Sequence, residues 1–281
     1  MELRVAATDS DFFAKLKSSP HPKLDFDVIA TMPTGRGLSA EPLWRSVNQF
    51  RAETMGLFTR LDEVLSEYSF GLALSESDKR AALRLRREIY ERKGLLPKPN
   101  DTRADDQLPH SGAAIFVAVR RGEVVGTVTI YPDSAAGLPM DDVHPLEARR
   151  MRCRFTTIAE VGHLAVAQKA RQSRIILPLF HRLFRWCLEH KVEGLLICVH
   201  PASARVYGSL LKFALLGRTR EHPRYSAPSV PLGLDLLAAR DQFRAAYFGL
   251  KEKMDLFSFF SSDLRTGPVT AELAVDRAKT A

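Results

Sequence analysis

This 281-residue sequence lacks the marks of a membrane, secreted or gene-regulatory protein. It contains no apolar run near the roughly 18 to 20 residues that cross a bilayer. Residues 1–20 lack the basic-then-apolar order of a secretory signal. No helix-turn-helix or zinc-finger pattern is present, so we expect no nucleic-acid partner. These absences together predict a cytoplasmic protein.

Cysteine is also scarce. The three residues, Cys153, Cys187 and Cys198, have spacings that match neither a zinc site nor a disulfide framework. No Cys-x-x-Cys pair is present to lower the pKa of a thiol. We therefore expect reduced cysteines and no metal site, with Cys187 and Cys198 buried as small apolar groups. A catalytic cysteine is the alternative.

Positive charge is unevenly distributed along the chain. The formal net charge is +8, yet residues 71–230 alone hold 26 Lys and Arg against 16 Asp and Glu. Such a region suits an acidic partner, which could be a nucleic acid, an anionic membrane or an acidic carrier protein. It could equally be a soluble basic surface, and composition does not choose among these readings.

Hydropathy divides the chain into a main domain with two extensions. Hydrophobic residues make up 45% of the sequence, which is enough for one substantial core. An irregular arm is followed at 41–68 by apolar residues at helical spacing. Near the C-terminus, an amphipathic helix is expected at 234–250 and an apolar patch at 256–260. That patch could cover a tunnel, touch a membrane or form a dimer contact. The predicted parts are 1–70, 71–230 and 231–281.

Within the main domain, helical and strand patterns alternate. Ser75 or Ser77 could cap the first helix and Gly94 could end it, before a long loop at 95–112. A short Gly-containing turn then joins two β-branched runs, as in a hairpin. This order predicts an α/β (α+β) fold with a mixed central sheet flanked by helices. The expected elements are helix 76–93, strands 113–119 and 124–131, helix 146–154, strand 156–166, helix 175–190, strand 194–199 and helix 202–213.

Three strings in this order resemble the GNAT acyltransferases. GEVVGTV at 122–128 resembles the central hairpin of that superfamily, and AEVGHLAV at 159–166 resembles the strand that ends at its acyl-donor site. ARVY at 204–207, with Phe213 after it, resembles the last helix, although its Tyr-to-Phe spacing is one residue longer than usual. The resemblance spans about residues 71–230 and implies a GNAT-like sheet there, to which the hydropathy pattern adds an N-terminal helical extension and a C-terminal helical segment.

Further strings resemble the N-acyl amino acid synthases, which are similar in turn to acyl-homoserine-lactone synthases. They are RREIY at 86–90, QLPH at 107–110, and Asp133 with GLPM at 137–140. This resemblance implies an enzyme that moves a long-chain acyl group from an acyl carrier protein to the amine of an amino acid. It implies no tightly bound cofactor.

The segment after the expected third strand departs from acetyl-CoA-dependent relatives. Those relatives place a glycine-rich loop there, whose bare N–H groups cradle a pyrophosphate. Residues 168–174 contain no glycine but carry Lys169, Arg171 and Arg174. Side-chain cations suit the single phosphate of phosphopantetheine on an acidic carrier protein. We therefore favour acyl carrier protein as the donor, with acyl-CoA as the alternative.

Amide formation requires a base that accepts a proton from the amine. Glu160 is the candidate, because burial in its apolar strand would raise its pKa. A carboxylate held by an arginine is the alternative. His163 would face away from Glu160 in a regular strand, and a bulge at Gly162 would change that. His163 could instead be structural, since the homoserine-lactone relatives have arginine there.

Other candidates carry a role only through the resemblance. Arg86 or Arg87 could grip the carboxylate of the amino acid, and Asp105 or Asp106 could order the long loop, although solvated charges and turn residues look the same. Tyr207 could protonate the leaving thiolate, but an aromatic residue on a helix is more often core. Leu164 and Val166 are expected to contact the substrate.

Two competing functions stay open. The chain could be an acyl-CoA- or acetyl-CoA-dependent N-acyltransferase or a homoserine-lactone-type synthase. It could also be a non-catalytic GNAT-like protein that binds lipid or nucleic acid through its basic face. The expected partners are acyl carrier protein and an amino acid, with peripheral membrane contact as a further expectation. The sequence predicts no oligomeric state.

Overall fold

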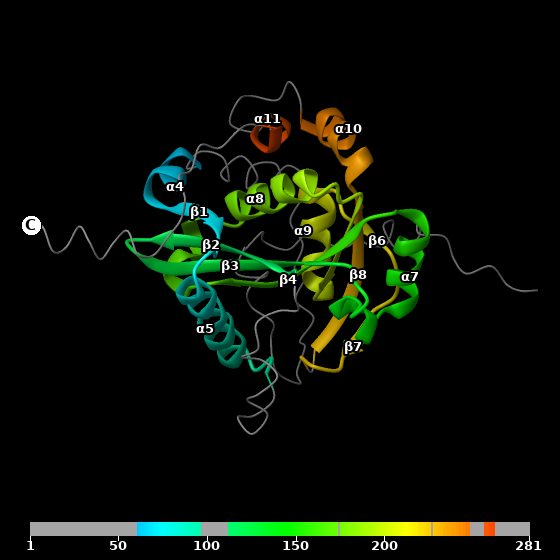
Figure 1. Ribbon diagram of the computed structural model, residues 1–281, viewed down its shortest axis with the longest axis horizontal. Coiled ribbons are helices and arrows are strands. Elements are labelled where there is room, and N and C mark those ends of the chain that lie inside the picture. Colours follow the sequence, from blue (N-terminus) through cyan, green and yellow to red (C-terminus); the bar gives the residue numbers. More distant parts are fainter. Residues whose placement is uncertain (1–60, 97–111, 174, 226, 248–255, 262–281) are drawn as a thin grey trace, which may run out of the picture.

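The computed structural model describes residues 61–96, 112–173, 175–225, 227–247 and 256–261. In that part of the chain, one mixed sheet has the strand order β1-β2-β3-β4-β5-β8-β6, and β7 pairs with β8 (Figure 1). The expected fold class is confirmed. The strands are β1 Ser69–Leu72, β2 Ala114–Arg120, β3 Glu123–Pro132, β4 Ile158–Val166, β5 Gly194–Val199, β6 Ala214–Leu215, β7 Arg220–His222 and β8 Ala227–Asp235.

The sheet is antiparallel except at its centre. β2, β3 and β4 form an antiparallel series, as the predicted hairpin required. β4 and β5 are parallel, and β8 then returns antiparallel to β5. The connection between the two parallel strands carries α8, Ile176–Glu189. Parallel neighbours need such a crossover, because the end of one strand and the start of the next lie at opposite edges of the sheet.

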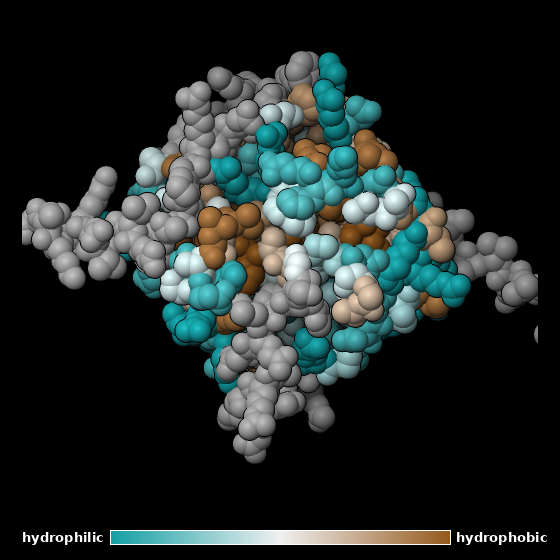
Figure 2. Space-filling view, viewed as in Figure 1, coloured by the Kyte–Doolittle hydropathy of each residue, from teal (hydrophilic) through white to brown (hydrophobic). Residues whose placement is uncertain are grey.

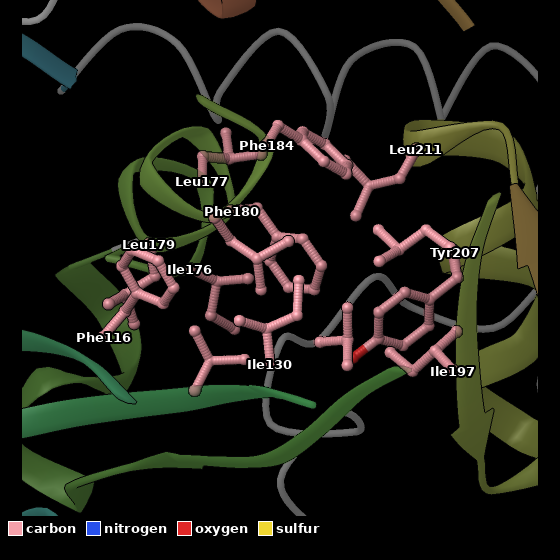
Figure 3. Close-up of a cluster of buried hydrophobic side chains, with 14 of the residues drawn as sticks. Phe116, Ile130, Ile176, Leu177, Leu179, Phe180, Phe184, Ile197, Tyr207 and Leu211 are labelled. Carbon is pink, nitrogen blue, oxygen red and sulfur yellow. The ribbon is translucent and has the colours of Figure 1, made fainter. Parts of the chain in front are cut away.

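Helices cover both faces of the sheet (Figure 1). On one face lies α5, Glu76–Arg92, whose N-cap Ser75 accepts a hydrogen bond of 3.1 Å from the Asp78 N–H. On the other face, α8 and α9, Pro201–Leu211, enclose the main apolar cluster, part of which Figure 3 shows. Successive strand residues point to opposite faces, so each face receives its own cluster.

The sheet extends beyond the limits expected for the main domain. β1 begins at Ser69, and β8 continues to Asp235. The helix expected at 234–250 begins only after β8, as α10, Leu236–Tyr247. The division into three domains therefore stays a prediction. The other helical elements are α4 Leu61–Glu67, η2 Pro139–Asp142, α7 Pro145–Arg154, η3 Gln168–Ser173 and α11 Leu256–Ser261.

Large apolar side chains are rarely exposed on the described surface. Leu74, Leu146, Leu188 and Leu237 are the exposed examples. Figure 2 shows one face, on which hydrophilic residues surround smaller apolar patches. No described helix combines the length and the apolar character that a bilayer crossing requires.

Candidate active site

The central parallel strands separate at one end and leave a cleft. Pairing of β4 with β5 runs from Ile158–Gly194 to Val161–Ile197. The next residues of both strands, including Gly162 and Cys198, line a cleft of about 110 Å³. Its described walls are Tyr90, Leu95, Tyr131, Pro139, Glu160, Val161, Gly162, His163, Cys198, Val199, His200, His222, Tyr225, Ala227, Pro228 and Ser229.

A β-bulge brings Glu160 and His163 to the same cleft. Thr129 of β3 lies opposite Gly162, but Thr127 lies opposite Ala165, so two residues of β4 face one residue of β3. His163 has a left-handed backbone with φ of 54°. This conformation is uncommon for a residue with a side chain, although His adopts it more readily than most. The strand is therefore not regular here: a bulge, the alternative considered at Gly162, is present with its left-handed residue at His163.

Glu160 is a buried carboxyl group at the base of the cleft. Its side chain is 3% exposed, and its Oε2 atom accepts a hydrogen bond of 2.7 Å from the Met140 N–H. Burial raises the pKa of Glu160 to about 8, against the lowering effect of that hydrogen bond. Asp141 and Asp142 raise it further, since a second negative charge nearby opposes ionisation. The carboxyl group can therefore hold or release a proton near pH 8.

His163 lies at the centre of a hydrogen-bond network. The buried Arg86 places its Nη1 atom 3.0 Å from Nδ1 of His163, and the Tyr131 hydroxyl also contacts Nδ1. Arginine can only donate, and its Nη1 atom is nearer to Nδ1 than to Nε2, at 3.0 against 3.5 Å. We therefore assign Nδ1 as the acceptor and place the ring proton on Nε2. Nε2–H then donates to the Tyr225 hydroxyl at 3.0 Å.

The same network keeps His163 neutral. Burial lowers its pKa well below the ordinary value of 6.5, and the positive charge of Arg86 lowers it further. A second proton would place an N–H of the ring against a guanidinium group that has only donors. His163 is therefore a neutral hydrogen-bonding group around pH 7.

The predicted carboxylate-binding residues have other partners. Arg86 contacts the Nδ1 atom of His163 and is not among the described residues that line the cleft. Arg87 donates to Glu91 one helical turn away, at 2.8 Å. Asp105 and Asp106 lie outside the described residues.

The predicted proton donor lies in the apolar core. Tyr207 on α9 is 3% exposed, and its ring packs edge-on against Phe180 (Figure 3). It packs edge-on against Phe213 as well. It is not one of the described cleft residues. Leu164 packs against the same core cluster, and Val166 belongs to it. The structure does not bring these three side chains to Glu160.

The predicted carrier-binding cations fall around η3. Lys169 is exposed and forms an ion pair with Glu123. Arg171 lies in η3, but its side chain is outside the described part, as is the whole of Arg174. The η3 segment directly follows β4, which is the strand that carries Glu160.

Several residues of the cleft were not identified from the sequence. Tyr131, His222, Tyr225 and Ser229 line it, and Met140 contributes its backbone N–H. Met140 belongs to the GLPM string, which carried the resemblance but had no assigned role. The aromatic residue at the end of the β3 pattern was a usable signal for Tyr131. Tyr225 had none, because it contacts His163 from 62 residues away.

The cysteines divide by environment. Cys187 is buried and Cys153 is exposed, while Cys198 is half-buried in the wall of the cleft. Burial raises the pKa of Cys198 to about 12, so its thiol is protonated near neutral pH. No three His, Cys, Asp or Glu side chains group as metal ligands within the described ranges.

Comparison with known proteins connects this cleft to an enzyme family. The family model described as N-acyl amino acid synthase FeeM matches residues 81–235, which include α7, β4 and β5 and most of α5. The chain belongs to this family. As a member of the FeeM family, it is an acyltransferase with a GNAT-type fold, as the resemblance implied.

The solved structure of FeeM agrees with this family, and two other solved structures are also similar. FeeM itself, an N-acyl amino acid synthase from uncultured soil microbes, is 26% identical with a TM-score of 0.56; the match covers 64% of this chain and 96% of FeeM. BjaI, a CoA-dependent acyl-homoserine lactone synthase, is 16% identical with a TM-score of 0.49, over 76% of this chain and 100% of BjaI. The homoserine-lactone synthase LasI is 16% identical with a TM-score of 0.45, over 61% and 92%. Among curated proteins, none matches the chain.

Proposed function

We propose that the protein transfers a long-chain acyl group from the phosphopantetheine thioester of an acyl carrier protein to the amine of an amino acid. The observation that carries this proposal is the buried Glu160 carboxyl group, with its pKa raised to about 8, at the separated end of β4 and β5. A base is most effective when its pKa lies near the working pH. Membership of the FeeM family supports an amino acid as the acceptor.

In the proposed reaction, Glu160 accepts a proton from the amine as nitrogen attacks the thioester carbonyl. A C–N bond forms and the C–S bond breaks. The proton that Glu160 took from the amine then passes to the departing thiolate, so a neutral thiol leaves and Glu160 is ionised again. His163 provides a neutral, fixed ring beside this centre, whose two nitrogens are held by Arg86, Tyr131 and Tyr225. Arg86 therefore acts by fixing this wall of the cleft rather than by gripping the carboxylate.

The segment after β4 supports a carrier protein as the donor. η3, Gln168–Ser173, contains no glycine, and a side chain on every residue hinders the close backbone approach that a pyrophosphate requires. Lys169 is exposed there. We propose that Lys169, Arg171 and Arg174 together bind the acidic carrier protein and the single phosphate of its phosphopantetheine.

The direct test uses purified protein with acyl carrier proteins bearing acyl chains of graded length and a panel of amino acids. N-acyl amino acids are measured by mass spectrometry, and the released thiol is measured in parallel. We expect equal amounts of both products, and loss of both in E160Q. E147Q is the matched control, because Glu147 is also buried but pairs with Arg220 outside the cleft. Release of thiol without any acylated amine would contradict the proposal.

The donor is tested separately. Acyl-CoA with the same chain should give a lower kcat/KM than the acyl carrier protein. Replacing Lys169, Arg171 and Arg174 together with Ala should raise KM for the acyl carrier protein and leave kcat unchanged, since peripheral charges act mainly on encounter. K79A is the control, because Lys79 forms a comparable surface pair with Glu76 on α5. Preference for acyl-CoA would reject the carrier protein as donor.

A further inference from the structure

The segment between β3 and α7 contains Asp133 and the GLPM string, neither of which has a role in the proposed reaction. Two carboxylates of this segment, those of Asp133 and Asp141, converge on one side chain of α7, Arg152. We propose that Arg152 is a positioning residue, which fixes the turn that presents the Met140 N–H to the Glu160 carboxyl group. This inference rests on the proposed function, because it takes Glu160 as the base.

Arg152 joins two carboxylates. Its Nε and Nη2 atoms donate to the two oxygens of Asp133 at 2.7 and 2.8 Å. Its Nη1 and Nη2 atoms donate to the two oxygens of Asp141 at 2.7 and 2.6 Å. Asp133 follows β3 directly and Asp141 lies in η2, so the guanidinium ties the end of β3 and η2 to α7. A planar guanidinium can make this double fork, whereas the point charge of a lysine cannot.

Asp141 in turn fixes the path of the turn. Its Oδ2 atom accepts a hydrogen bond of 2.7 Å from the Leu138 N–H. Gly137 has φ of 78°, and a Cβ atom at this position would lie 2.9 Å from the same oxygen. Only glycine therefore fits beside the carboxylate. Two residues after Leu138, the fully buried Met140 directs its N–H to Glu160 at 2.7 Å.

The charges around Glu160 give this arrangement a measurable consequence. Asp141 and Asp142 on η2 raise the pKa of Glu160, whereas the Met140 N–H and Arg152 lower it. Tyr131 on β3 and Cys198 on β5 also interact with Glu160, and burial keeps both protonated. The histidines of the same cleft, His163, His200 and His222, have pKa values lowered by burial. Loss of Arg152 removes a positive charge, leaves Asp141 unshielded and loosens the Met140 N–H. All three changes act in one direction and raise the pKa of Glu160.

The test is the pH dependence of kcat/KM for R152Q. A base acts in its ionised form, so the rate falls as the pH falls through its pKa. We expect the acid limb of R152Q to move up by about one pH unit, which makes kcat/KM about tenfold lower at pH values below the wild-type pKa. The rate should recover at high pH. A purely structural role would lower the rate equally at every pH.

Two variants serve as comparisons. R152K keeps the charge but loses the fork, so its acid limb should lie between those of wild type and R152Q. R154Q is the matched control, because Arg154 is on the same helix but pairs with Asp235 at 2.6 Å, away from η2. Its profile should equal that of the wild type.

D133N provides a second route if R152Q fails to fold, because it removes half of the fork and leaves the Arg152–Asp141 pair. Asp133 is not among the charges that shift the pKa of Glu160, so the loosened turn decides the sign and we expect a smaller shift in the same direction. A wild-type acid limb in every soluble variant of Arg152 and Asp133 would overturn the inference. Full activity in E160Q would instead reject the base itself, so the two failures can be told apart.

Discussion

The guanidinium group of Arg86 on α5 lies 3.0 Å from the Nδ1 atom of His163 on β4. A buried cation thus holds a neutral imidazole by its unprotonated nitrogen and leaves Nε2–H for Tyr225. The contact connects a helix on one face of the sheet to the bulge in the central strand. The tautomer and charge of His163 therefore depend on a residue outside the cleft.

Arg86→Met should change the titration of His163. The substitution removes a positive charge and a donor, so the pKa of His163 should rise. It should stay below 6.5, because burial is the larger cause of the lowering. The measurement is an NMR titration of ¹⁵N-labelled imidazoles, with R87M as the control, since Arg87 pairs with Glu91 instead. An unchanged midpoint in R86M would show that Arg86 does not set the charge state.

Glu160→Gln should remove a pH dependence of stability. The pKa of Glu160 is about 8 in the folded state, against 4.5 for an ordinary glutamate. Between these values the folded state binds more protons than the unfolded state, so its stability falls as the pH rises. The free energy of unfolding of E160Q, relative to wild type, should increase by about 1.4 kcal/mol per pH unit across this window. Urea unfolding at pH 5, 6, 7 and 8 measures it, and a constant difference would contradict the folded-state pKa.

Tyr207→Phe and Tyr131→Phe should have opposite outcomes. Tyr207 packs with Phe180 and Phe213 in the core, so Y207F should keep the wild-type kcat. Tyr131 donates to His163, so Y131F should lower kcat by about tenfold or less, as expected for one hydrogen bond. The measurement is steady-state turnover with acyl carrier protein. A large loss in a well-folded Y207F would restore the role of proton donor to Tyr207.

The three thiols should react at different rates. Only the thiolate reacts with a disulfide reagent. Cys153 is exposed to solvent. Cys198 is half-buried, which raises the pKa of its thiol to about 12, and Cys187 is completely buried. At pH 8 the native protein should show one fast thiol, which C153S lacks, and urea should expose the other two. A fast phase that persists in native C153S would contradict this order.

Much of the fold could be predicted because its signals are local. The β-branched runs around Gly122 gave the β2–β3 hairpin, and the apolar periodicity gave α8. β8 was missed, since Pro228 and Pro231 argue against a strand when only the sequence is considered. Its pairing with β5 on one side and with β6 and β7 on the other outweighs that local preference.

The candidate site divides in the same way. Glu160 stood out because a carboxyl group interrupts an apolar strand, which is visible in one short string. Its environment did not, because the Met140 N–H reaches it from 20 residues away. The left-handed backbone of His163 also has no sequence signal, since His is permitted there but not required. Contacts between distant segments therefore account for most of what was missed.

The late position of β8 affects when the protein becomes active during translation. The chain up to β5 leaves the ribosome before β8 does, and β4 and β5 can then pair. A nascent chain of this length already contains Glu160 and His163. Tyr225 and Ser229, which form part of the opposite wall, arrive only with the segment that ends at Asp235. Until that strand has been synthesised and has paired with β5, Glu160 remains open to water on this side. Catalysis therefore begins only after nearly the whole domain has emerged.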